Sequence, residues 1–94
     1  MKRMELIANR SVKEELIGVL EQGISDFYYT LLPEVHGRGE TAYRLGTATW
    51  PEENFMLISY LENHEADRAN TLVQEVKARF SGEGIKLFFM EAGG

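Results

Sequence analysis

Residues 54–62, NFMLISYLE, are a nearly continuous apolar run of strand length. Such a run predicts a central strand that is covered on at least one face. Residues 63–80, NHEADRANTLVQEVKARF, follow with Asn63 as the expected N-cap, acidic residues near the start and basic residues near the end. This charge order complements a helix dipole and predicts a helix. Apolar residues recur in it at helical spacing and define its inner face: Ala69, Leu72, Val73, Val76 and Phe80.

The residues before this pair predict a strand, a helix and a second strand. Residues 3–8, RMELIA, alternate with a period of two, which predicts the first strand. Ser11 and Glu14 have the spacing of a capping box, so a helix is expected to start there, and Gly23 can supply the left-handed residue that ends it. Residues 26–36, DFYYTLLPEVH, are rich in aromatic and β-branched side chains and predict the second strand.

The last stretch completes a recognisable order of elements. The turn SGEG, residues 81–84, leads into IKLFFME, residues 85–91, which predicts the final strand. Strand, helix, strand, strand, helix, strand is the split βαβ of an α+β, ferredoxin-like fold, with a four-stranded antiparallel sheet and two helices on one face. Pro33 cannot donate to a ladder and favours an edge position or a bulge for the second strand. We expect residues 1–94 to form this one domain.

The face of the sheet away from the helices would be open. Strand alternation is expected to turn aromatic side chains such as Phe27, Tyr29 and Phe88 outward on that face. A set of exposed aromatic side chains usually marks an interface. A homo-oligomer in which the sheets of several copies close together is therefore expected.

Composition narrows the class of protein. A net charge of −5 argues against nucleic-acid binding, which needs clustered Lys and Arg. The absence of Cys excludes a disulfide framework, a thiolate metal site and a Cys nucleophile. The sequence has neither a signal-peptide apolar run nor an 18-residue apolar stretch, so a cytoplasmic protein without direct membrane insertion is expected. No serine or carboxylate lies in a catalytic motif, and an enzyme is not expected.

Two short motifs resemble those of the PII signal-transduction proteins of nitrogen regulation. EVHGRG, residues 34–39, resembles the base of the family's T-loop, and SGEGIKLFFM, residues 81–90, resembles its B-loop. The resemblance implies a PII-like homotrimer whose sheets line a central interior and whose inter-subunit clefts bind a nucleotide, with ADP, AMP and ATP as candidates. It also implies that the long polar loop, residues 37–53, contacts a target protein such as a membrane transporter or a regulatory enzyme.

The resemblance assigns ligand binding to the two glycine turns. Backbone N–H groups in such a turn can hold a phosphate, but a helix C-cap followed by a strand entry has the same sequence. Ile85 stands where the family places its phosphate-binding Lys, so Lys86 becomes the candidate cation. Arg38 is either a phosphate ligand across a subunit boundary or a solvated loop charge. The candidate ligand residues are Gly37, Arg38, Gly39, Gly82, Glu83, Gly84 and Lys86.

The loop also supplies the candidate contacts to a target protein, namely Tyr43, Arg44 and Trp50. Arg44 is a second candidate for a phosphate, and Trp50 either covers the edge of the core or anchors a partner. Two alternatives to a PII-like regulator stay open. One is a CutA-like metal-binding trimer in which His36 and nearby carboxylates hold zinc or copper. The other is an interaction module without a ligand.

Overall fold

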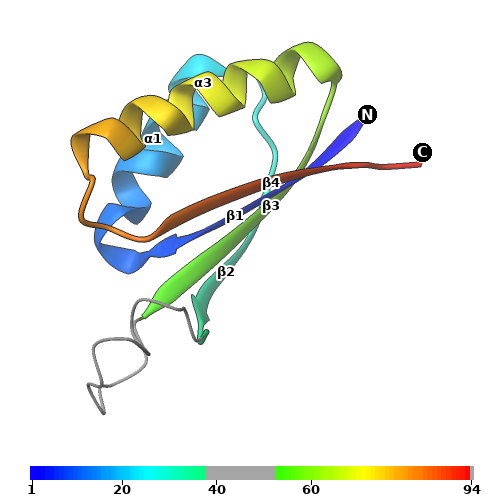
Figure 1. Cartoon of the computed structure of the whole chain (residues 1–94). Coiled ribbons are helices and arrows are strands. Elements are labelled where there is room, and N and C mark those ends of the chain that lie inside the picture. The colour runs from blue at the N-terminus through cyan, green and yellow to red at the C-terminus, as the bar shows by residue number, and fades with distance from the viewer. Residues whose placement is uncertain (38–52, 94) are drawn as a thin grey trace.

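The computed structural model describes residues 1–37 and 53–93. Figure 1 shows two helices on the same side of a sheet, as the sequence predicts for a ferredoxin-like α+β fold, and this prediction is confirmed. None of the helices in the described ranges is both long and apolar enough to cross a membrane. The elements in chain order are β1 (Lys2–Asn9), the 3-10 turn η1 (Arg10–Val12), α1 (Lys13–Gly23), β2 (Thr30–Val35), β3 (Asn54–Leu61), α3 (Asn63–Arg79) and β4 (Ile85–Glu91).

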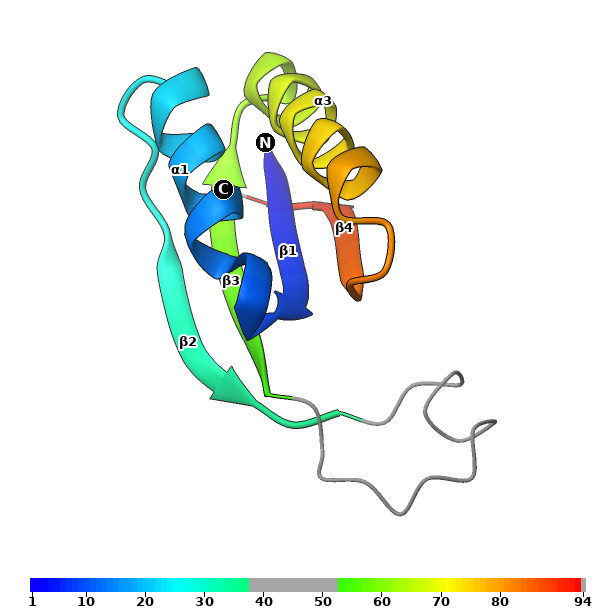
Figure 2. The ribbon, with the colours of Figure 1, turned by 90° about the vertical axis from the view of Figure 1, so that its left-hand side faces the viewer.

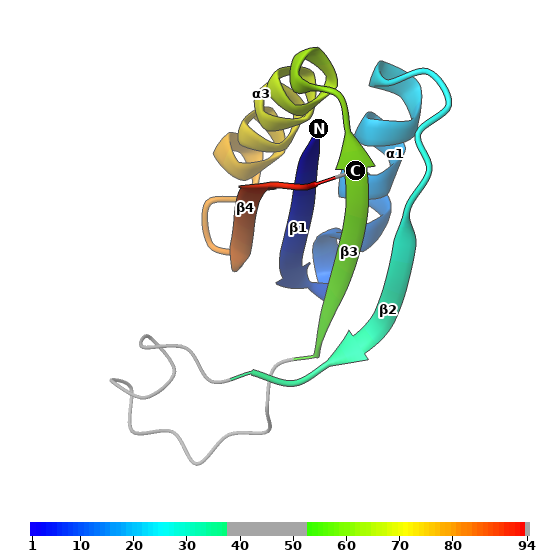
Figure 3. The same cartoon turned by 90° about the vertical axis from the view of Figure 1, so that its right-hand side faces the viewer.

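The strands form one antiparallel sheet in the order β2-β3-β1-β4. In Figure 2 helix α1 lies in front of the sheet, whereas Figure 3 shows the strands from the opposite side. The register pairs Asn9 with Asn54, Ala8 with Ile85, and Val35 with Asn54. The C-terminal ends of β1 and β2 therefore meet the N-terminal ends of β3 and β4 at one end of the sheet.

The core lies between the sheet and the two helices. Met4, Leu6 and Ala8 alternate along β1 and are buried, as period-two patterning requires of a strand with one covered face. β3 buries Phe55, Leu57 and Leu61 on the same side of the sheet. The helices cover this layer with buried apolar residues from η1, α1 and α3: Val12, Leu16, Leu20, Ala66, Ala69, Leu72, Val73 and Val76.

Both predicted helix starts are wrong in detail. Ser11 is not an N-cap, because the turn η1 precedes α1 and is capped by Asn9, whose side-chain Oδ1 accepts from the Ser11 N–H at 2.9 Å. α3 is capped by Glu62 instead of Asn63, and the Glu65 carboxylate accepts from the Glu62 N–H at 2.8 Å. In each case a polar side chain one or two residues earlier satisfies the first free N–H groups.

Gly23 does not supply a left-handed residue, although it ends α1. The left-handed residue is Asp26, with φ of 53°. A Cβ on Gly23 would lie 2.5 Å from Leu72 Cδ1, so glycine at this position lets α1 approach α3 closely. The close approach of two helices, and not the backbone conformation, explains this glycine.

The second strand is shorter than predicted, covering 30–35 and not 26–36. It is an edge strand with an irregularity between Leu32 and Val35, so the expectation from Pro33 is confirmed. Phe27 packs against the core, and the Tyr29 hydroxyl donates to Glu21 of α1 at 3.3 Å. The prediction that these two aromatic residues line the open face is therefore wrong. Left-handed Asp26 redirects the chain, and α1 supplies a partner for Tyr29.

The open face of the sheet is nevertheless largely apolar. Phe88 and Tyr60 lie on it and are 49% and 54% exposed, so the expectation for Phe88 is confirmed. Cross-strand pairing places them on one face with side chains from all four strands. The apolar members of this open face are Ile7, Leu32, Met56, Ile58, Tyr60, Phe88 and Met90.

Candidate functional site

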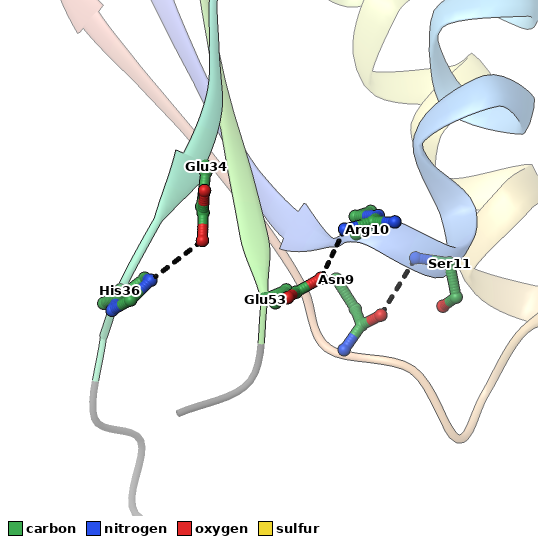
Figure 4. A network of polar contacts seen from close by, with 6 residues as sticks. All are labelled: Asn9, Arg10, Ser11, Glu34, His36 and Glu53. Carbon is green, nitrogen blue, oxygen red and sulfur yellow. Dashed lines mark hydrogen bonds and ion pairs between the residues drawn. The ribbon is translucent and has the colours of Figure 1, made fainter. Parts of the chain in front are cut away.

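The turn η1 joins two segments that are far apart in the sequence. At the C-terminal end of β1, the Asn9 N–H donates to the Gly84 carbonyl at 3.0 Å. The next residue, Arg10, donates its N–H to the Glu53 carbonyl at 2.9 Å. Its guanidinium Nη1 lies 2.5 Å from Glu53 Oε2, an ion pair on the protein surface (Figure 4). We call Asn9, Arg10, Glu53 and Gly84 the junction.

Asn9 gives the junction its local shape. Its backbone is extended, and its side chain folds back to accept from the Ser11 N–H, as Figure 4 shows. Asn9 is therefore both the last residue of β1 and the N-cap of the turn η1. The backbone N–H groups of Asn9 and Arg10 thus hold the residues just before β4 and β3, which are Gly84 and Glu53 respectively.

Asn9→Ala is expected to lower the free energy of unfolding by about 1 kcal/mol, because the cap of the turn is lost. The backbone hydrogen bond to Gly84 does not depend on this side chain. Urea unfolding followed by circular dichroism measures the change. Asn70→Ala on the surface of α3 is the matched control and is expected to stay within about 0.5 kcal/mol of the wild type. Equal changes in the free energy of unfolding for the two substitutions would contradict the capping role of Asn9.

Three glycines of the predicted ligand turns lie in the part of the chain that the structure describes, and neither packing nor backbone conformation there requires them. Gly37, Gly82 and Gly84 do not have left-handed backbones, and a Cβ on any of them would meet no other atom of residues 1–37 and 53–93 within 4 Å. The Glu83 N–H donates to the Phe80 carbonyl at 3.0 Å, so it is not free to bind a phosphate. Within residues 1–37 and 53–93, the Gly82 and Gly84 N–H groups have no hydrogen-bond partner.

Two neighbouring residues at the start of β4 face opposite sides of the sheet. Ile85 is buried in the core, whereas Lys86 is exposed on the open face and pairs across the strands with Ile7. A cation at position 86 thus lies on the other side of β4 from position 85, because side chains alternate along a strand. The structure places Lys86 on the open face, next to the turn with Gly82 and Gly84.

His36 lies just beyond β2, and its Nε2 is 3.3 Å from Glu34 Oε1 (Figure 4). Both side chains are exposed. Over the described ranges, the structure contains no group of three or more His, Asp or Glu side chains arranged to hold a metal ion. The remaining candidates, Arg38, Gly39, Tyr43, Arg44 and Trp50, lie outside the described residues.

An open hollow of about 530 Å³ lies beside the junction on the helix side. It has both signs of charge, because Arg10 and Lys13 line it together with Glu14 and Glu15. Sequence reasoning missed Asn9, Arg10 and Glu53. A signal for Arg10 and Glu53 exists in their opposite charges, but it becomes visible only when the register of β1 and β3 is known.

Comparisons with solved structures identify the fold. The chain is similar to CPII, a nitrogen regulatory PII-like protein from Thiomonas intermedia K12 bound to ADP, AMP and bicarbonate. The TM-score is 0.67 and the identity 17%, over 99% of this chain and 92% of that one. It is also similar to the apo form of CPII, with a TM-score of 0.60 and 14% identity over 99% of this chain and 91% of that one.

A second protein shows the same similarity. For a PII-like signalling protein from Thermus thermophilus, the TM-score is 0.65 and the identity 19%, over 95% of this chain and 82% of that one. No protein-family model and no curated protein matches the sequence. The chain thus has the fold of these PII-like proteins, although it is only 14–19% identical to them in sequence.

Proposed function

We propose that this chain is a PII-like regulatory protein that binds an adenine nucleotide between subunits of a homotrimer. The observation that carries the proposal is the position of Gly37, Gly82 and Gly84. All three lie at the same end of the sheet, and the isolated chain needs none of them for packing or for backbone conformation. Glycines of this kind leave the backbone open to close approach by a ligand or by a neighbouring subunit.

The fold supports the same proposal. CPII, to which the chain is similar over nearly its whole length, is bound to ADP and AMP in its solved structure. The open face, with Phe88 and Tyr60 about half exposed, supports assembly because an apolar patch of this kind usually marks an interface. In the proposal, Lys86 and Arg38 supply positive charge to the phosphates, with the free N–H groups of Gly82 and Gly84 beside them.

The effector would act on a target protein through residues 37–53. A ligand can shift the equilibrium between two states of a protein only if it binds the two states with different affinity. The junction gives a physical route, because Gly84 and Glu53 are both hydrogen-bonded to the Asn9–Arg10 backbone. The target class we propose is a membrane transporter or a regulatory enzyme, controlled by binding and not by catalysis.

Thermal unfolding with ATP, ADP or AMP tests nucleotide binding. A nucleotide present at about 100 times its dissociation constant should stabilise the native protein by about 2.7 kcal/mol. The variant Gly82→Ala/Gly84→Ala should fold and lose this stabilisation, because the added methyl groups meet nothing in the chain but block close approach to the turn. Gly18→Ala in α1 is the matched control, since its Cβ also meets no atom, and it should keep the nucleotide effect.

Two results would contradict the proposal. One is a wild-type protein that no adenine nucleotide stabilises at millimolar concentration. The other is a glycine variant that is stabilised as much as the wild type, which would place the ligand elsewhere. Light scattering on the same samples gives the mass, which for a trimer is three times the 10.7 kDa of the chain.

A further inference from the structure

A charged pair lies on the open face of the sheet, on the inner strand β1. Arg3 Nε donates to Glu5 Oε2 at 2.9 Å, and Arg3 Nη1 donates to the Tyr60 hydroxyl at 2.8 Å. The pair lies on β1, an inner strand of the sheet, and both side chains are mostly covered, with 33% and 22% of their surface exposed. The hydrogen bond to Glu5 and the one to Tyr60 raise the pKa of Arg3.

The neighbours of this pair are apolar on both sides. Arg3 lies beside Met90 of β4, and Glu5 lies between Ile58 of β3 and Phe88 of β4. Only part of the hydrogen-bonding capacity of the pair is used within the chain. Among the described residues, Arg3 Nη2 and Glu5 Oε1 have no hydrogen-bond partner.

If a purely apolar surface covered the open face, these two groups would be removed from water and left without a hydrogen-bond partner. Buried charged groups are costly unless paired, so the covering surface must bring a donor and an acceptor to the same place. A second copy of this chain meets the requirement, because each copy has one acceptor, Glu5, and one donor, Arg3. An acidic or a basic partner would satisfy one of the two groups and repel the other.

We propose that neighbouring copies pair Arg3 of one subunit with Glu5 of the next, and that this pairing fixes how the copies are rotated against one another. The inference rests on the proposed homotrimer and names the contact that orders it. In the proposed ring of three copies, each boundary joins Arg3 of one subunit to Glu5 of the next, which is a head-to-tail contact. Apolar contact alone is poorly directional, whereas a polar pair inside an apolar interface can specify the number and register of the copies.

Charge reversal with mixing tests the pairing. Arg3→Glu and Glu5→Arg, each alone, should weaken self-association at least tenfold, because every contact then brings like charges together. Mixing the two variants should restore much of the assembly, because every boundary between unlike chains of a mixed ring pairs a Glu with an Arg. One boundary between like chains remains in a ring of three, so the rescue is partial. Native mass spectrometry resolves the mixed species and their masses.

The matched control reverses a charged pair that does not lie on the open face. Lys2 pairs with Glu91 at the end of the sheet, and Lys2→Glu and Glu91→Lys should assemble as the wild type does, alone or mixed. The Arg3→Glu/Glu5→Arg double variant restores the pair within one chain. Circular dichroism on it, and on each single variant at low concentration, shows that the subunit folds.

The outcomes separate this inference from the proposed function. Mixed assemblies that form only from the two single variants together support the inter-subunit pair. Single variants that assemble like the wild type, or folded single variants that mixing does not rescue at all, overturn it and leave the trimer intact. A wild-type protein that is monomeric at every concentration overturns the trimer and this contact together.

Discussion

Phe55→Ala is expected to lower the free energy of unfolding by about 3–5 kcal/mol, the largest effect that we expect of any single core substitution here. Phe55 is fully buried on β3, between the sheet and the helices. Its removal leaves a cavity that a packed core cannot fill by relaxing. Total stabilities of small domains are about 5–15 kcal/mol, so the variant would be close to unfolding at room temperature.

Phe88→Ala is the matched control for this prediction. Phe88 lies on β4, on the opposite face of the sheet, and is 49% exposed in the single chain. Denaturant unfolding at low protein concentration, where subunits are separate, should show a much smaller loss for Phe88→Ala. At high concentration the Phe88 variant should associate more weakly than the wild type. Similar losses for the two variants in separated subunits would contradict the assignment of the two faces.

Met56→Asp is expected to convert the assembled protein into folded monomers. Met56 lies on the open face with Leu32 and Ile7 as its cross-strand neighbours, so the new carboxylate would enter the proposed interface between two apolar side chains. Burying an unpaired charge in this interface would cost more free energy than the contact between subunits provides. In the separated subunit the same carboxylate stays in contact with water, and the fold should survive.

Analytical ultracentrifugation measures the mass of this variant, and circular dichroism measures its fold. Gln74→Asp adds the same charge on the exposed surface of α3 and should leave the mass unchanged. A Met56→Asp protein that keeps the wild-type mass would show that the open face is not the contact between subunits. A Met56→Asp protein that is unfolded even when dilute would show that this position supports the fold itself.

The fold followed from the sequence wherever periodicity was strong. β4 matches its predicted range of 85–91, and β3 and α3 differ from theirs by one residue at their C-terminal ends. The 26–29 stretch was misassigned, because aromatic side chains at a strand start and in a packed connection look the same. What separates them is the left-handed backbone of Asp26, and a sequence gives no certain sign of it.

The site was less accessible to sequence reasoning. The Arg10–Glu53 pair joins residues 43 positions apart, and it follows directly from the register that pairs Asn9 with Asn54. A sequence predicts that two strands exist, but the register between non-adjacent strands depends on the packed structure as a whole. By contrast, strand alternation predicts from the sequence that Ile85 and Lys86 face opposite sides of the sheet, and the structure has Ile85 in the core.

The two edges of the sheet carry different risks of aggregation. β2 has Pro33 and an irregular register, and both features hinder the addition of a foreign strand. The other edge, β4, reads IKLFFME, with an unbroken apolar run from Leu87 to Met90 and no proline. Short segments of high β propensity and low net charge are the usual starting points of fibrils. In concentrated solutions of separated subunits, fibril growth should therefore begin at β4, and a proline or a second lysine there should delay it.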